Sequence, residues 1–395
     1  MANIPVKWAH SGMRGAPVIS GVAGSLISAL RTFLITGFAP TAAVSATALD
    51  GIATIMLPSA QSFEEHGVVL LAGATTPGFN GEERVLTTAS DRITVATTAA
   101  NGPIAGSITV RYAPVGGWEE VFSKTNVSVF RSTDVTGSRF FLRVDDTGTT
   151  AARVMAYESM TDVDTGLGAF PTPAQSNGGG YWHKSGVANA VAVRWKMFAD
   201  SRFLALAVAA VSHQSAAHIS APLRGFGDPI ALSPSGDVWS CMISVAGSGN
   251  TNNSGFLDSC VPSSAGNGIH CARGISGMGG SVVCNPRAYT SNSSEVSGVS
   301  TYLGAGPSAV DGEIKLSKLF VSETATNSAP RAEIPGVRFI PQTGVNAILI
   351  DGDILPGASE LQERRLMAVN TGTNQGVSNP AGVYLVDTTG PWREQ

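Results

Sequence analysis

The chain has 395 residues and a net charge of -4, with 43% hydrophobic and 14% charged residues. The charged fraction lies below the roughly 25% of an average soluble protein. A polar but weakly charged surface is typical of secreted proteins and of proteins built into assemblies, because few charges oppose self-association. Basic residues form no run longer than the pair in Glu363-Arg364-Arg365, which argues against direct nucleic-acid binding.

The N-terminus lacks the pattern of a secretory signal, so we expect synthesis in a cytosol. The long apolar stretch from Phe203 to Val211 is far shorter than the roughly 20 residues that a membrane-spanning helix needs. The sequence therefore predicts no membrane insertion.

Residues 1–45 are expected to form an N-terminal arm and one helix that serve for attachment. The first 20 residues show no periodicity and resemble an extended arm that needs a partner surface. From Ser25 onward, apolar residues recur at helical spacing, with Ser25 as the expected cap and Gly37 as the expected end. The apolar stripe has to pack either on a neighbouring sheet or between subunits.

Residues 46–113 carry short strand patterns with regular turn signals, which predict a small β-barrel or β-sandwich domain. Five strands are expected, at Ile52 to Met56, Val68 to Ala72, Glu83 to Thr88, Arg92 to Ala96 and Gly106 to Arg111.

The strongest fold signal is a hairpin between Ser138 and Met160. Phe140, Leu142 and Val144 alternate with more polar neighbours, which is the two-residue period of a half-buried strand. A turn rich in Thr and Gly follows, and then a second strand.

Residues 114–395 are expected to form a larger β-sandwich with long loops, in which 240–300 differ most in character. The runs Ala190 to Phe198 and Phe203 to Val211 are nearly continuous in apolar residues, as in strands covered on both faces. Gly178 to His183 is interpreted as a loop carrying aromatics. Further strands are predicted at Val238 to Val245, Gly268 to Ala272, Ser281 to Cys284, Lys315 to Ser322, Asn346 to Ile350, Leu366 to Asn370 and Gly382 to Asp387. The fold class is mainly β.

Four carboxylates gather in sequence around the hairpin, namely Asp145, Asp146, Asp162 and Asp164. They could form a glycosidase pair or a calcium site, but aspartates at hairpin ends also serve as turn residues, and this interpretation is preferred. Asp351 and Asp353 are likewise interpreted as turn residues.

Histidines and cysteines show no metal-binding spacing. His213 and His218 are five positions apart, whereas helical zinc sites use three or four. His183 or His270 could add a third ligand, although ordinary core or loop histidines are preferred. Structural or free thiols are preferred over disulfides and over a metal for the four cysteines, which are Cys241, Cys260, Cys271 and Cys284.

Neither a serine-hydrolase motif in a strand-turn-helix unit nor a phosphate-binding loop is found in the sequence, and we expect neither enzymatic activity nor a cofactor. Rigid aromatics in loops could form a surface for carbohydrate or protein, with core packing as the alternative. The candidates for this interaction surface are Tyr181, Trp182, Trp239, Tyr289 and Tyr302.

Several segments resemble, in matching order, a family of structural proteins of tailed bacteriophages and prophages. They include GVVLLAGATTPGFNG at Gly67 to Gly81, LRVDDTGTT at Leu142 to Thr150, YESMTDVDTG at Tyr157 to Gly166 and DTTGPWR at Asp387 to Arg393. The resemblance implies a virion protein of the tail tip, baseplate or tail fibre, with other virion proteins as partners.

Within that resemblance, capsid decoration and binding to a host surface glycan or pilus are the alternatives. A polysaccharide-degrading tailspike is a third. Trimers or hexamers are expected because virions are symmetric. Assembly would take place in the host cytoplasm, and the sequence leaves open whether the cysteines pair.

Overall fold

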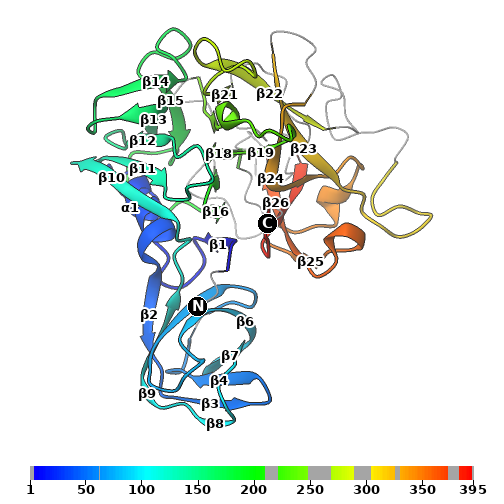
Figure 1. Ribbon diagram of the computed structural model, residues 1–395. Helices are drawn as coiled ribbons and strands as arrows, with labels where there is room; N and C mark the ends of the chain where they lie inside the picture. Colours follow the sequence, from blue (N-terminus) through cyan, green and yellow to red (C-terminus); the bar gives the residue numbers. More distant parts are fainter. Residues whose placement is uncertain are drawn as a thin grey trace.

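In the computed structural model 47% of the chain is strand and 6% is helix, and the strands pair antiparallel, so the predicted mainly β class is confirmed. The structure describes residues 4–61, 63–209, 221–247, 268–288, 304–324, 330–371 and 382–393. A small unit projects from a larger body (Figure 1). We call residues 38–113 the N-terminal β unit, and residues 4–37 together with 114–393 the body.

The body begins with a strand and a helix. Strand β1 spans Lys7–His10, helix α1 spans Ser25–Arg31, and a π-helical turn continues over Thr32–Thr36. Residues 1–20 were expected to be an extended arm that needs the surface of a partner. Instead β1 pairs antiparallel with β16 (Trp195–Ala199), and Val6, Lys7 and Trp8 are buried. The partner surface of this segment is therefore the chain itself.

The predicted helix and its apolar stripe are confirmed. Its five stripe residues are at most 4% exposed, and they are Leu26, Ile27, Leu30, Phe33 and Leu34. The stripe packs within the chain, because all five side chains belong to the main hydrophobic core. The predicted Ser25 cap is wrong, since Gly24 occupies the cap position.

The N-terminal β unit is one curled sheet whose eight described strands follow the order β2-β9-β5-β6-β7-β4-β3-β8. All five predicted strands are confirmed, but the unit starts at Phe38 rather than at residue 46, because two further strands precede β4. The bounds are β2 Phe38–Ala42, β3 Ser45–Leu49, β4 Ile52–Met56, β5 Val68–Ala74, β6 Gly81–Ala89, β7 Arg92–Ala96, β8 Gly102–Pro103 and β9 Gly106–Tyr112.

The predicted hairpin is confirmed as β12 and β13 at the centre of a six-stranded sheet in the described part of the chain. Leu142, Val144, Val154 and Ala156 are at most 1% exposed and face the main core. The bounds are β10 Trp118–Lys124, β11 Val127–Ser132, β12 Phe141–Asp145, β13 Ala151–Met160, β14 Gly166–Phe170 and β15 Gly180–His183. The aromatic loop predicted at Gly178 to His183 is wrong from Gly180 on, because this segment pairs with β13.

The second sheet of the body has 13 described strands and runs from β1 through β16 and β17 to β27, β26 and β25. The predicted cover on both faces is confirmed for Trp195 to Phe198 and for Phe203 to Val208, since all residues of β16 and β17 are buried. The first strand begins five residues later than predicted, and Ala190 to Ala192 are exposed. The remaining bounds are β17 Phe203–Val208, β18 Leu223–Gly227, β19 Ile230–Ala231, β20 Met242–Ser244, β21 Ile269–Cys271, β22 Val282–Ala288, β23 Ser317–Glu323, β24 Ala332–Phe339, β25 Ile354–Pro356, β26 Arg365–Thr371 and β27 Gly382–Asp387.

Two strand predictions in this sheet differ from the structure. Val238–Ser240 is a 3-10 turn before β20, and Val345–Ala347 is a 3-10 turn where a strand from Asn346 to Ile350 was expected; a third 3-10 turn spans Ser359–Leu361. Strand β24 was not predicted, because its Pro335-Gly336 pair is typical of a turn.

Hydrophobic residues of all three sheets belong to one contiguous core. Trp118 from the six-stranded sheet packs against Phe226 of β18, and Trp182 donates its indole N–H to Ser244 O at 2.7 Å. The two sheets of the body therefore form one sandwich-like core. Among the described helices, none has the length and hydrophobicity that a bilayer crossing requires.

Candidate functional site

The aromatic surface expected from the sequence is not assembled as one exposed patch. Trp182 is 0% exposed and belongs to the core, which corrects its assignment as a contact residue. Tyr181 and Trp239 are half-buried, and each ring is covered by a guanidinium at 4.0 Å, from Arg153 and Arg273 respectively. The other two candidates, Tyr289 and Tyr302, lie outside the described residues.

Three of the four hairpin carboxylates are held in local structure. Asp145 accepts hydrogen bonds from Thr147 N and Oγ1, and Asp162 accepts from Asp164 N at 2.7 Å and Thr165 N at 2.9 Å. Asp164 itself forms ion pairs with Lys124 and Arg143. The turn interpretation accounts for the contacts of Asp145 and Asp162, whereas Asp164 is held by its ion pairs.

Asp146 has a different function, which the sequence did not reveal. Its carboxylate is fully buried, accepts from Leu26 N at 2.8 Å and Ile27 N at 3.3 Å, and forms an ion pair with buried Lys184. An aspartate 120 residues from Leu26 thus takes the place of the helix cap. Burial raises the pKa of the Asp146 carboxyl and lowers the pKa of Lys184, so the pair depends on its mutual contacts.

Asp351 and Asp353 are structural as well. Asp351 pairs with buried Lys196 and accepts from Asn370 N at 2.9 Å, whereas Asp353 accepts from Ile350 N at 2.8 Å. The predicted turn at Asp351 to Asp353 is confirmed, and the ion pair across 155 residues is an additional finding.

The described cysteines are free and buried, as preferred for Cys241, Cys271 and Cys284, while Cys260 lies outside the described residues. Cys271 and Cys284 lie on neighbouring strands with their Sγ atoms 3.4 Å apart. The contact with Cys284 and burial together raise the pKa of the Cys271 thiol.

His183 and His270 are buried, and His213 and His218 fall outside the described residues. Within the described ranges, no three His, Cys, Asp or Glu side chains gather as a metal site would require.

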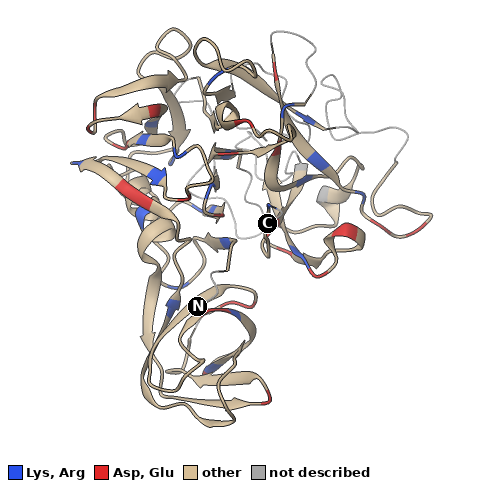
Figure 2. Cartoon of the chain, viewed as in Figure 1, with Lys and Arg blue, Asp and Glu red and all other residues tan. Residues whose placement is uncertain are grey.

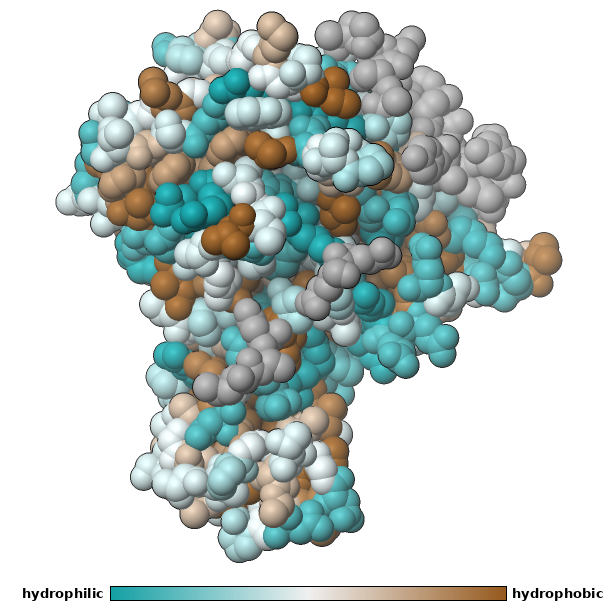
Figure 3. Space-filling model, in the orientation of Figure 1, coloured by the Kyte–Doolittle hydropathy of each residue, from teal (hydrophilic) through white to brown (hydrophobic). Residues whose placement is uncertain are grey.

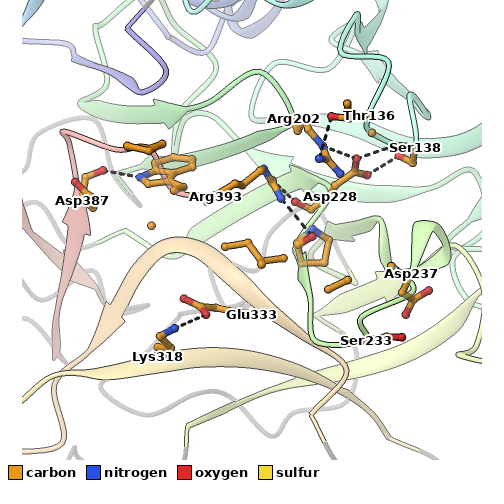
Figure 4. Close-up of a pocket in the computed structure, with 18 of the residues that line it drawn as sticks. Thr136, Ser138, Arg202, Asp228, Ser233, Asp237, Lys318, Glu333, Asp387 and Arg393 are labelled. Atoms are coloured by element: carbon orange, nitrogen blue, oxygen red, sulfur yellow. Dashed lines mark hydrogen bonds and ion pairs between the residues drawn. The ribbon is translucent and has the colours of Figure 1, made fainter. Parts of the chain in front are cut away.

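The structure does bring together a polar cavity of about 810 Å³ that the sequence had not indicated. It lies in the body between the 136–138 loop, the segments around β18 and β19, and the face of β23, β24 and β27 (Figure 4). We call it the polar cavity. Its charged lining residues are Arg202, Asp228, Asp237, Lys318, Glu333, Arg338, Glu360, Arg364, Asp387 and Arg393.

One side of the polar cavity is tightly hydrogen-bonded. Asp228 accepts from Ser138 N at 2.8 Å and from Arg202 Nε at 3.3 Å. Arg393 pairs with Asp200 at 3.0 Å and donates to the backbone oxygen of Asp228. Figure 4 shows these groups converging opposite Lys318 and Glu333. This side is a rigid wall, because its charged groups are already engaged.

The opposite wall is less completely paired. Glu333 forms ion pairs with both Lys318 and Arg338, each at 3.0 Å, so two cations share one carboxylate. Arg364 lies 3.6 Å from Asp387, which is an ion pair but too long for a hydrogen bond. Unused donors therefore gather on this wall.

Sequence reasoning missed the cavity because its residues come from seven separated stretches of chain. Only the segment that ends in Trp392-Arg393 had drawn attention, and for its resemblance rather than its chemistry. No local signal pointed to these residues, because Arg338, Arg364 and Arg393 are separated by 26 and 29 positions in the sequence. Figure 2 shows Lys and Arg interspersed with Asp and Glu over the body.

Comparisons with protein-family models and with curated proteins each returned no match.

Proposed function

We propose that the chain is a non-enzymatic structural component of a tailed-phage virion, located at the tail tip or baseplate. The observation that carries the proposal is the ordered resemblance of the segments from Gly67 to Gly81, Leu142 to Thr150, Tyr157 to Gly166 and Asp387 to Arg393 to such proteins. Its weakly charged β architecture also suits a protein of a symmetric assembly, for which a trimer or hexamer is expected.

The regions that contain these segments meet in the fold, which supports treating the resemblance as one pattern. Arg84 of the N-terminal β unit donates to Thr388 O at 3.1 Å and Thr389 O at 3.3 Å. Lys7 and Glu82 add an ion pair of 2.8 Å across the same junction. The unit is therefore held to the body at several points and can transmit a fixed orientation.

The N-terminal β unit is the best candidate for attachment to other virion proteins, because it projects from the body (Figure 1). At its β3–β4 turn, Leu49 and Ile52 are opposite each other and are 63% and 39% exposed. On the face shown in Figure 3 the unit is mostly weakly polar. A surface of this kind is suited to burial in an assembly.

Immunogold labelling of intact particles tests the location. Label at the tail tip or baseplate supports the proposal, label over the head would indicate the alternative of capsid decoration, and unlabelled particles would overturn both. Deleting residues 1–45 is not a clean test, because β1 and α1 belong to the core.

Point variants test the attachment surface without disturbing that core. The double variant Leu49→Ser, Ile52→Ser should lower incorporation into particles, whereas the control Val310→Ser, at a residue 95% exposed in the body, should leave it unchanged. Equal incorporation of both variants would exclude the β3–β4 turn as the contact.

Host-receptor binding is the second candidate function, and the polar cavity is the observation that favours it. In that case purified protein should compete with phage adsorption to host cells, and competition should fail at saturating protein if the function is absent.

A further inference from the structure

Two arginines that line the polar cavity have incomplete hydrogen bonds. The side chain of Arg364 is 26% exposed, and its buried Nη1 has no hydrogen-bond acceptor among the described residues. Arg338 donates from Nη1 to Glu333 and to Val337 O, while its Nε has no acceptor in the described part of the chain. A desolvated donor without an acceptor is unfavourable, so these groups would gain from a ligand that accepts their hydrogen bonds.

Strand register places these donors on one wall. Lys318 is opposite Arg338, Arg338 is opposite Leu385, and Asp387 is opposite Leu366. Residues directly opposite each other in an antiparallel pair point to the same face. Lys318, Arg338 and Asp387 therefore share a face, and Arg364 immediately precedes β26 on the same edge.

The loop that presents Arg364 is held in an unusual backbone conformation. Ser359 and Glu363 both have left-handed backbones, with φ of 53° and 69°. Non-glycine residues adopt this region at a cost, which persists where the surroundings fix it and is concentrated at ligand-binding sites. The strained backbone thus lies next to Arg364, a cation of the cavity whose hydrogen bonds are incomplete.

The rest of the lining complements a polyhydroxylated molecule. Hydroxyl groups of Thr136, Ser233 and Ser235 and the exposed carboxylate of Glu360 offer partners for sugar hydroxyls. Val238, which is 53% exposed, offers an apolar contact for the C–H face of a ring. The cavity is within the range of volumes that hold small ligands.

We propose that the polar cavity binds a short acidic saccharide, with Arg364 and Arg338 recognising its acid group and the hydroxyl and carboxylate groups recognising the sugar. A guanidinium matches carboxylate and phosphate oxygens equally in shape, so the acid group is either of these. Binding is a property of the isolated chain, so this inference goes beyond the proposed virion location and does not depend on it.

Isothermal titration of the full chain with three probes tests the inference. The probes are a galacturonic acid trimer, glucose 6-phosphate and a neutral glucose trimer. Saturable binding of one acidic probe, and weaker or undetectable binding of the neutral trimer, is expected, and the acidic probe that binds identifies the acid group. Absence of binding by both acidic probes, or equal binding of all three, would overturn the inference.

Two variants locate the binding. Arg364→Gln should lower the affinity for the acidic probe about tenfold or more, because a charge-assisted contact is lost. Among the described residues its ion pair is the long one with Asp387, so thermal stability should be unchanged. Arg287→Gln, at a half-buried arginine of β22 outside the cavity, is the matched control and should bind as the parent does. Equal affinities of the two variants would place the ligand elsewhere.

Glu360→Gln gives an independent check, because it removes an exposed carboxylate from the rim without touching the arginines. Gln keeps a carbonyl oxygen that can accept from a sugar hydroxyl, so the variant changes mainly the charge. Loss of the negative charge should strengthen binding of the acidic probe and leave binding of the neutral probe unchanged. Weaker binding of the acidic probe by this variant would count against recognition of an anion.

Discussion

The N-terminal β unit and the body of this protein are stabilised in different ways. Among the described residues of 38–113, every buried side chain is apolar or is Tyr112, whereas the body buries Lys7, Asp146, Lys184, Lys196 and Arg331 among others. The charged groups of the body form ion pairs between distant segments, such as Asp146 with Lys184 and Lys196 with Asp351. The unit thus depends on local alternation, and the body on specific long-range polar contacts.

The largest expected effect tests the buried pair at the start of α1. Asp146→Ala leaves buried Lys184 without its counter-ion and two helix N–H groups without their acceptor. It should lower the free energy of unfolding by about 3–5 kcal/mol. Urea denaturation measures it. Asp145→Ala, at the neighbouring turn residue, should cost far less, and equal effects would show that Asp146 is also only a turn residue.

The double variant Asp146→Asn, Lys184→Met separates loss of charge from loss of shape. It should recover much of the stability lost in Asp146→Ala, because no unpaired charge remains buried. If the double variant is as unstable as the single one, the ion pair itself contributes the stability.

A smaller effect is expected at the floor of the polar cavity. A Cβ on Gly336, whose φ is +70°, would lie 2.3 Å from the Trp392 ring. Gly336→Ala should therefore destabilise the body by about 2–4 kcal/mol, through backbone strain and overpacking. Gly279→Ala is the control, since Gly279 has φ of +78° and open space around it. Thermal melts followed by tryptophan fluorescence should separate the two variants.

Paired core substitutions ask whether the two regions unfold together. Ile55→Val in the unit and Ile243→Val in the body each remove one methylene from a side chain that is 0% exposed, at a cost of about 0.5–1.5 kcal/mol. Because both residues belong to one contiguous core, calorimetry should show a single unfolding transition, and each substitution should lower its midpoint temperature by a similar amount. Two transitions, each sensitive to one substitution, would contradict this.

The smallest effect depends on pH. Arg31 of α1 donates to both carboxylate oxygens of Glu120 at 2.7 Å, and this hydrogen bonding lowers the pKa of Glu120. A carboxyl whose pKa is lower in the folded state than in the unfolded state stabilises the fold at pH values above its unfolded-state pKa. This stabilisation is lost as the pH falls through its folded-state pKa.

Arg31 is 42% exposed, so Glu120→Gln should cost no more than about 1 kcal/mol at pH 7. The difference from the parent chain should shrink below pH 4.5, the ordinary pKa of this carboxyl. Urea denaturation at both pH values measures it, and a pH-independent difference would point to packing instead.

The accuracy of the sequence-based predictions follows the same division. In the N-terminal β unit five strands were predicted correctly, because the alternation of apolar residues such as Ile93 and Val95 with polar ones indicates which side chains are buried. In the body, β24 was missed because its Pro-Gly pair resembles a turn, although its strand neighbours hold it in the sheet. The acceptor for the first N–H groups of α1 was predicted locally at Ser25, whereas a residue of the hairpin provides it.

By itself the sequence determined the mainly β class, the hairpin of β12 and β13, and the apolar stripe of α1, since each is recorded in the spacing of neighbouring residues. Only the tertiary structure decided that Trp182 is core, that Asp146 caps a helix, and that Arg338, Arg364 and Asp387 line one cavity. The reason is that burial of a polar or aromatic side chain, and the meeting of charges far apart in the chain, depend on strand pairings that local spacing does not encode.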